Sequence, residues 1–404
     1  MANEQGVATT LSRVKQSGLG SPGSSGSKLM RRVTFGLNKS AQKYSSAEIA
    51  SHQQSTGATE GPSSVQGPLN AELSAGTYDL EFAALLRKDF AAAFTSITSV
   101  ALTIAASGSL YTVTRGSGDF LTGGVKIGHV VRLSVGTLDA ANINKNLLVV
   151  GVTATVLTVT PLNGSSMTAE GPIAGCTVAS AGKETHTPTT GHTNDYFSWE
   201  RKFNTLSRYE LFTDVKVSSA DISFPATGIP TVNFALSGLG RSPSASETLT
   251  SPTAESTSSV LTSARGKIAI NGAVTSVTGI QMQITGNITT GEAEVGNNSY
   301  SDLQRGRIAV TGTFTAKFSS VTLQTIRDNQ TAVTLIASLA DDATATANFI
   351  VITLPAIKLF TDDIDDGEKE LIRSYQFEAQ YYGAGGASLA QHATICMIQD
   401  SLAA

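Results

Sequence analysis

The stretch at residues 215–240, VKVSSADISFPATGIPTVNFALSGLG, decides the fold class of this 404-residue chain. On either side of the turn at residues 226–229, apolar and polar residues alternate, which is the pattern of two paired β-strands with one buried face. The apolar positions are Val215, Val217, Ile222, Phe224, Val232, Phe234 and Leu236. The interruption at residues 218–220 predicts a β-bulge. The sequence therefore predicts an antiparallel sheet with one wet face.

A second predicted strand pair lies at residues 274–288 and 306–318. The segment that joins the two strands, residues 289–304, is much longer than a hairpin needs. Projecting loops of this kind commonly carry contacts to a partner. Long strands with few charges or prolines at their edges favour pairing with a neighbouring copy. These features predict a subunit whose sheet is completed by other copies of the chain, as a closed multi-subunit barrel.

Other segments predict a short helix and a separate β domain. Apolar spacing over Leu80–Phe94, with Asp79 as N-cap, indicates a helix, and residues 319–330 form a second helix candidate. Short Val-, Leu-, Ile- and Thr-rich runs over residues 97–184 predict a small antiparallel barrel or sandwich inserted into a larger domain. The predicted domains are a flexible arm at 1–29, a discontinuous main domain at 30–96 and 193–385, the inserted domain at 97–192, and a tail at 386–404.

Composition excludes several classes of protein. The net charge is −4 and only 15% of residues are charged, so the chain lacks the basic face of a protein that grips nucleic acid. The two cysteines, Cys176 and Cys396, form no disulfide framework or zinc pattern. No long apolar run predicts a secretory signal or a membrane-spanning helix.

The acidic run at residues 362–373, DDIDDGEKELIR, superficially resembles a calcium-binding loop. Asp362 and Asp366 match ligand positions one and five of that loop. Positions three and twelve are Ile364 and Arg373, which supply no carboxylate. A solvated loop between strands is the better interpretation.

Two further groups of residues fail as catalytic or metal sites. His186 and His192, with Cys176 upstream, form only a loose trio, so we expect exposed loop histidines. Glu292 and Glu294 lie in a glycine-rich loop that could not hold them as a catalytic pair. No nucleophile elbow is present. The sequence therefore predicts no enzyme, no cofactor and no metal site.

The single aromatic cluster comprises Tyr196, Phe197 and Trp199. A sugar-binding platform is one interpretation of this cluster, and packing in a core or between subunits is the favoured one. The cluster keeps one alternative function open, a phage or bacterial surface β protein that binds glycans.

Several blocks of the sequence resemble the major tail tube proteins of long-tailed bacteriophages, in the larger variety with an inserted domain. These blocks are residues 76–90, 212–242, 274–288 with 303–318, and 348–360 with 374–382. Together they cover most of residues 30–96 and 193–385. Residues 118–136 with 147–159 look like a small β module common in phage tail proteins.

This resemblance implies a mainly β subunit of β-sandwich or barrel type, in which six copies form a ring around one inner barrel. Stacked rings would form a tube for DNA ejection, in a virion whose proteins are made in the host cytoplasm. The implied partners are further copies and the terminator, distal tail and tape measure proteins, in a tail of the non-contractile, siphovirus type. The inserted domain would lie outside, and the N-terminal arm and the 289–304 loop would contact the next ring. The candidate contact residues are Glu292, Glu294, Asn297, Asn298, Tyr300 and Asp302.

One physical argument from composition agrees with this resemblance. DNA must slide through a tail tube without sticking, and each phosphate contact from an inward lysine would add salt-dependent affinity. A low-charge, net acidic, hydroxyl-rich chain avoids such contacts. The sequence does not assign the lumen-facing residues, because a register shift of one residue exchanges the two faces of a strand.

Overall fold

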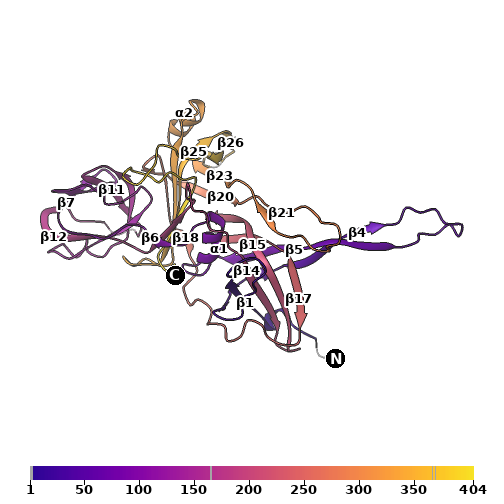
Figure 1. The fold of residues 1–404 in the computed structure, drawn as a ribbon. Coiled ribbons are helices and arrows are strands. Elements are labelled where there is room, and N and C mark those ends of the chain that lie inside the picture. Colours follow the sequence, from indigo (N-terminus) through magenta and orange to yellow (C-terminus); the bar gives the residue numbers. More distant parts are fainter. Residues whose placement is uncertain (1–2, 164–165, 366, 369) are drawn as a thin grey trace.

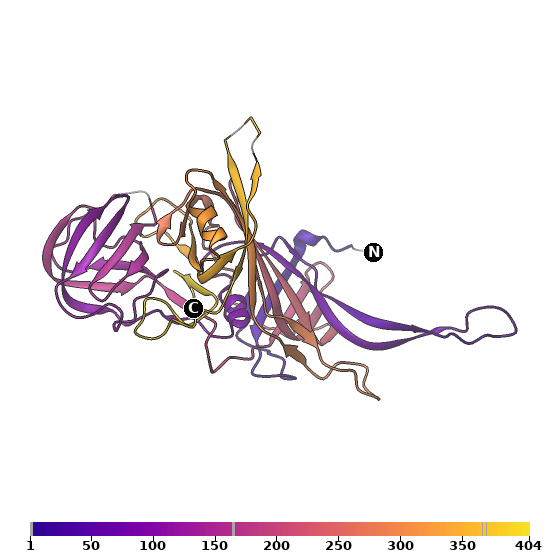
Figure 2. The same cartoon turned by 90° about the horizontal axis from the view of Figure 1, so that it is seen from above.

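The computed structural model describes residues 3–163, 166–365, 367–368 and 370–404. The chain is mainly β, as predicted, and has two bodies: a β-sandwich with a long projecting hairpin and a closed β-barrel at its side (Figures 1 and 2). Asp366, which was compared with position five of a calcium-binding loop, lies outside the described residues. Among the helices of these described ranges, none is long and apolar enough to span a membrane.

The main sheet of the sandwich contains the two strand pairs predicted from the sequence. Its six antiparallel strands, in spatial order, are β5 (Ala58–Glu72), β16 (Thr231–Gly238), β15 (Arg208–Pro225), β20 (Val277–Thr285), β23 (Ala309–Lys317) and β27 (Ile372–Ala379). The register of β15 against β16 shifts between Val217 and Ser219, which confirms the predicted bulge. The apolar face of this sheet, including Ile222, Phe234 and Phe314, is buried in the sandwich core.

A second layer of strands covers the apolar face of the main sheet. Its strands are β24 (Val333–Ala340), β25 (Phe349–Leu359), β18 (Thr262–Ile270) and β19 (Ala273–Val274). Leu335 and Ile352 point into the sandwich core, whereas Ile336 and Val351 join a separate apolar cluster shared with the barrel. β24 and β25 are nearly continuous apolar runs because both of their faces are covered, whereas β18 and β19 at the margin of the layer are partly exposed.

The N-terminal segment is more ordered than the predicted flexible arm. After a 3₁₀ turn, η1 (Gly6–Ala8), β1 (Thr9–Lys15) pairs with β14 (Phe197–Phe203). Leu11 enters the core, and the buried guanidinium of Arg13 lies 2.7 Å from the Glu81 carboxylate. These contacts offset the ordering entropy that the polar composition alone could not. Three short or flanking strands complete this region: β2 (Lys28–Leu29), β3 (Thr34–Phe35) and β17 (Gly240–Ser244).

The inserted body is a closed six-stranded barrel that runs from Ile97 to Ser180. Its strands are β7 (Ile97–Ser107), β8 (Leu110–Arg115), β9 (Val130–Ser134), β10 (Leu147–Val152), β11 (Val156–Pro161) and β12 (Glu170–Ser180). Alternate residues of these strands, such as Leu102, Val113 and Val159, fill a core of its own. The barrel therefore has no free sheet edge.

The predicted C-terminal tail also forms part of the folded body. β28 (Met397–Asp400) is buried and lies between β25 and β13 (Lys183–His186), pairing with both. The short strand β6 (Ala91–Ala92) pairs with the other side of β13. The end of the chain thus joins the sandwich to the segments that enter and leave the barrel.

The first helix, α1 (Asp79–Leu86), is shorter than the predicted Leu80–Phe94. It ends because Arg87 adopts a left-handed conformation, with φ 62°, and its guanidinium donates to the carbonyls of Gly286 and Gly306. Asp79 is the first helical residue and not the N-cap, which is Tyr78. The second predicted helix forms as α2 (Thr322–Asp328).

Candidate functional site

The face of the main sheet that points away from the sandwich core carries continuous cross-strand rows of polar side chains. One row consists of Asn70, Asn233, Asp221, Gln283, Thr311 and Glu378, each paired with the next. The neighbouring row consists of Glu72, Thr231, Ser223, Gln281, Thr313 and Gln376. All twelve side chains are half-buried or exposed. The two rows run across all six strands of the main sheet.

This polar face carries negative charge and no positive charge in either row. Its charged members are Glu72, Asp221 and Glu378; the other members are amides and hydroxyls. The Gln283 amide donates to the Asp221 carboxylate at 2.5 Å. The face is hollowed into an open groove of about 630 Å³. The two rows themselves offer no cation to which a phosphate could bind; the nearest lysines, Lys358 and Lys317, lie at the margin of this face.

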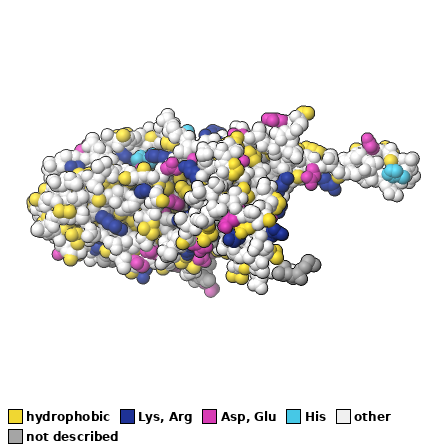
Figure 3. Space-filling view, turned by 60° about the horizontal axis from the view of Figure 1, so that its bottom comes forward, with side chains coloured by type: hydrophobic (Ala, Val, Ile, Leu, Met, Phe, Trp, Pro, Cys, Tyr) yellow, Lys and Arg dark blue, Asp and Glu magenta, His cyan; other side chains and the backbone are white. Residues whose placement is uncertain are grey.

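The longest projection of the molecule is a two-stranded arm made of β4 (Asn38–Ser45) and the first half of β5 (Figures 1 and 3). Among the described strands, β4 pairs with β5 alone, so its outer edge is open. At the tip, between residues 46 and 57, Ile49 is fully exposed. An open strand edge and an apolar tip with no partner in the same chain are features of a surface that pairs with another molecule.

The segment predicted to project between the second strand pair forms the small hairpin of β21 (Ile288–Thr290) and β22 (Leu303–Arg305). Its base is fixed to the sandwich by Lys216, whose ammonium donates to the Leu303 carbonyl at 2.7 Å and lies 3.8 Å from Asp302. Burial lowers the pKa of Lys216 to about 8. The Tyr196 hydroxyl donates to Asp302 at 2.7 Å, and burial with this bond raises the tyrosine pKa to about 12.

The six candidate contact residues of this hairpin fall into two groups. The four at the tip, Glu292, Glu294, Asn297 and Asn298, are exposed. Tyr300 and Asp302 are half-buried, and Asp302 is turned toward the sandwich as described. The Asn298 carbonyl accepts from the backbone N–H of Ser63 at 3.0 Å, so the tip is tethered to the arm strand β5. Glu292 and Glu294 therefore lie in a solvated loop, as expected.

The acidic run at residues 362–373 forms the hairpin of β26 (Asp363–Asp365) with β27, which projects from the sandwich in Figure 2. Asp362 is nearly buried and forms ion pairs with Arg373 at 2.6 Å and Arg327 at 3.3 Å. Burial opposes ionisation, but these arginines and the Gln324 amide keep the pKa of Asp362 below its usual value. Asp362 is thus an ion-pair residue, whereas Asp363–Asp365 are exposed, as predicted for a solvated loop.

The aromatic cluster packs in the interior, which confirms the favoured interpretation. Tyr196, Phe197 and Trp199 are each at least 97% buried. Phe35 stacks on Trp199 with ring centroids 5.6 Å apart. The cluster cannot present a stacking platform to a sugar without unfolding this part of the core.

His186 and His192, both expected in an exposed loop, differ in exposure. His192 is exposed, as predicted, but His186 lies in β13 with its ring stacked on His392, so the prediction for His186 was wrong. Cys176 is buried in the barrel core, and the structure does not bring the trio together. His186 instead joins Glu184, His129 and His392. Sequence spacing gave no signal for this cluster, because its members come from three distant segments.

The fold and these surfaces define a β-rich subunit with open edges and projecting loops, in which no grouping of polar residues described above forms a catalytic constellation. The sequence model of the family described as phage tail tube protein matches residues 6–380. The chain therefore belongs to the phage tail tube protein family, and its role is that of a structural virion component. A search of curated proteins gives no significant match.

Proposed function

We propose that six copies of the chain form a ring, that rings stack into the tail tube, and that DNA passes through its lumen into the host. The observation that carries this proposal is the polar face of the main sheet, whose two rows contain three carboxylates and no cation. Turned inward, this face would line a channel that holds no phosphate in place. The role is architectural and requires no catalytic group.

The layering of the subunit supports the inward orientation of this face. The second strand layer lies behind the main sheet, and the barrel packs on the far side of that layer, against residues such as Phe349 and Val351. The polar face and the barrel are therefore on opposite sides of the sandwich. A ring lined by the polar face would carry the barrel on its outside.

The projecting elements are the proposed contacts between copies. The open edge of β4 and Ile49 at the arm tip suit strand pairing and apolar contact with a neighbouring copy. The exposed tip of the β21–β22 hairpin, with Glu292, Glu294 and Asn297, would contact the next ring. The tube would also join terminator, distal tail and tape measure proteins after synthesis in the host cytoplasm.

Electron microscopy of the purified full-length chain, with three matched variants, tests this assembly. Ile49→Asp and Val295→Asp place a charge on the fully exposed aliphatic residue at each tip; Val321→Asp does the same on an exposed residue near α2. We expect hollow tubes from the wild type and from Val321→Asp, and short or no tubes from the other two. A wild type that stays monomeric when concentrated would contradict the ring, and normal tubes from both tip variants would contradict the contact sites.

The glycan-binding alternative has lost its structural basis, because the aromatic cluster on which it depended is buried. A glycan array with the full chain checks this directly. Specific binding in the absence of tubes would favour the alternative over the assembly.

A further inference from the structure

The barrel is joined to the sandwich through the C-terminal segment. The buried ammonium of Lys126, just before β9, donates to the carbonyls of Gly386, Ala387 and Leu389. The Gln399 side chain in β28 accepts from the backbone N–H of Val130 at 2.7 Å. An apolar cluster shared by the barrel and the second strand layer lies beside these bonds. The joint therefore consists of apolar packing together with a polar section.

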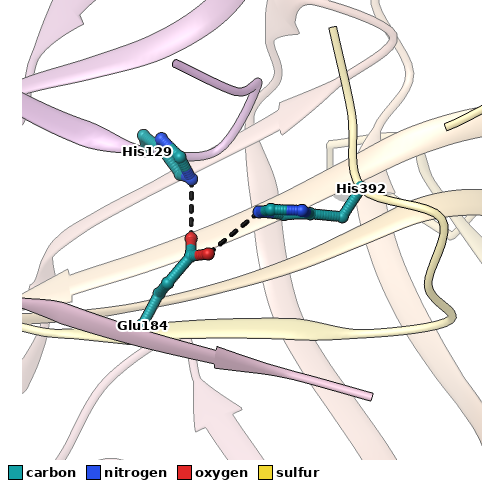
Figure 4. A group of neighbouring side chains, drawn as sticks. All are labelled: His129, Glu184 and His392. Carbon is teal, nitrogen blue, oxygen red and sulfur yellow. Dashed lines mark ion pairs between the residues drawn. The ribbon is translucent and has the colours of Figure 1, made fainter. Parts of the chain in front are cut away.

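Glu184 is the centre of the polar section (Figure 4). Its Oε2 lies 2.6 Å from His129 Nε2 of the barrel, and its Oε1 lies 2.9 Å from His392 Nε2 of the C-terminal segment. His186 Nδ1 is 3.5 Å from Oε1, and its ring stacks on His392 with centroids 4.1 Å apart. One buried carboxylate thus connects the barrel, β13 and the end of the chain.

One hydrogen bond to the His129 ring indicates which of its nitrogens carries the proton that faces this carboxylate. The backbone N–H of Lys126 points at His129 Nδ1 from 3.1 Å, so that nitrogen is an acceptor and the ring proton lies on Nε2. The Lys88 ammonium lies 3.0 Å from His186 Nε2 and 3.3 Å from His186 Nδ1, so a positive charge already sits beside this ring. A cation at the centre would compete with the His129 proton and would add to the ammonium charges of Lys88 and Lys126.

The charges around Glu184 disfavour any further cation in the cluster. The charged neighbours that it attracts are Lys88, which follows α1, and Lys126 in the barrel. Together with Glu184 they already give one net positive charge. A proton taken up by His186 adds another cation to a buried volume with a single anion. Acid should therefore open the joint.

We propose that the Glu184–His129–His186–His392 cluster is an acid-sensitive latch, which holds the barrel and the C-terminal segment on the sandwich at neutral pH and releases them below about pH 6.5. Burial, with repulsion from His392 and Lys88, lowers the pKa of His186 although Glu184 opposes this. The open form then binds more protons than the closed form, so closure weakens as the pH falls. Burial would raise the pKa of Glu184, but His129, His186 and His392 hold it well below its usual value, so the anion persists.

Cys396 provides a local probe of the latch. Its thiol is fully buried directly before β28, four residues from His392. The Cys396 carbonyl accepts from the backbone N–H of Thr187, the residue after His186. Opening the latch should expose this thiol, while the core of the barrel stays closed. A Cys176→Ala background leaves Cys396 as the single cysteine.

The test measures the labelling rate of Cys396 by 4,4′-dithiodipyridine between pH 7.5 and 5.5, in the full-length chain and normalised to the unfolded chain at each pH. One net proton taken up on opening raises the open population tenfold per pH unit, so we expect at least a tenfold increase. Hydrogen exchange should show new exposure of the Ile127 and Val130 N–H groups, which donate across the joint, and of residues 389–398, but continued protection of residues 147–161.

Matched variants distinguish a latch from a purely structural cluster. His186→Gln with His392→Gln keeps N–H donors but cannot titrate, and should flatten the pH profile; His192→Gln changes an exposed histidine outside the cluster and should leave it unchanged. The latch would be overturned if labelling did not depend on pH, or if the double variant kept the wild-type pH profile. It would also be overturned if the barrel lost protection together with the joint, or if stoichiometric Zn²⁺ suppressed labelling.

Discussion

The β23 strand of the main sheet and the β25 strand behind it are both long and antiparallel, yet their sequences follow different rules. In β23, exposed Thr311 and Thr313 alternate with the buried Val310 and Phe314, because one face is wet. In β25, every residue except Lys358 is buried, because the sandwich core covers one face and the barrel covers the other. The pattern of a strand thus records how many of its faces are covered.

The largest effect should follow from a charge on the doubly covered strand. Val351 in β25 is fully buried in the cluster shared with the barrel, so Val351→Asp leaves a carboxylate without water or a partner and should cost about 4 kcal/mol or more. Thr313→Asp on the wet face is the control and should stay within about 1 kcal/mol. Urea unfolding measures both, and equal losses would contradict the difference between the strands.

Within β23 itself, neighbouring positions should differ by several kcal/mol. Phe314→Ala creates a cavity in the sandwich core and should reduce the free energy of unfolding by about 3–5 kcal/mol. Thr313→Ala removes an exposed side chain and should cost about 1 kcal/mol or less. Thermal unfolding of the two variants compares the faces directly, and similar melting temperatures would mean that Phe314 is not in the core.

A positive charge on the wet face should change function without changing the fold. Thr313→Lys would place six ammonium groups around each proposed ring, and assembled tubes should then retain DNA with an affinity that falls as salt rises. Thr313→Gln keeps the polarity without charge and serves as the control. Filter binding of DNA fragments to tubes measures retention. Equal retention by both variants would place this face outside the lumen.

The smallest effect concerns the anchor of the β21–β22 hairpin. Because burial lowers the pKa of Lys216 to about 8, the unfolded chain binds more protons than the folded chain between about pH 8 and 10.4. Stability should therefore rise slightly across that interval. The rise should disappear in Lys216→Met, as measured by urea unfolding at each pH. A rise of the same size in that variant would assign the effect to another group.

The sequence predicted the main sheet well because its signal is local. Alternation around residues 226–229 identified β15, its bulge and β16, and the same period located β20 and β23. The N-terminal segment was predicted as an arm, since its stability depends on the distant partners of Leu11 and Arg13, which composition does not show. The first helix was predicted to continue beyond Leu86 because the bonds from Arg87 to Gly286 and Gly306 that end it are not local.

The polar face could be predicted as a face but not assigned a direction. The strand register determines which residues share a face of the sheet. Which of the two faces is buried depends on the covering layer of β24 and β25, and that layer is remote in sequence. The latch was not predictable at all, because Glu184 collects His129 from 55 residues earlier and His392 from more than 200 residues later. No local period links such positions.

The apolar surface of the second strand layer, on which the barrel packs, makes the inserted barrel difficult to remove. Gly128, with φ 92°, brings the barrel so close to β25 that a Cβ there would collide with the Thr353 side chain. A shortened chain without residues 97–180 would leave Ile336, Phe349 and Val351 facing solvent. A minimal subunit without the barrel would therefore need polar residues in place of Ile336, Phe349 and Val351. Replacing the barrel with a different domain would instead require only that the new domain cover this apolar surface.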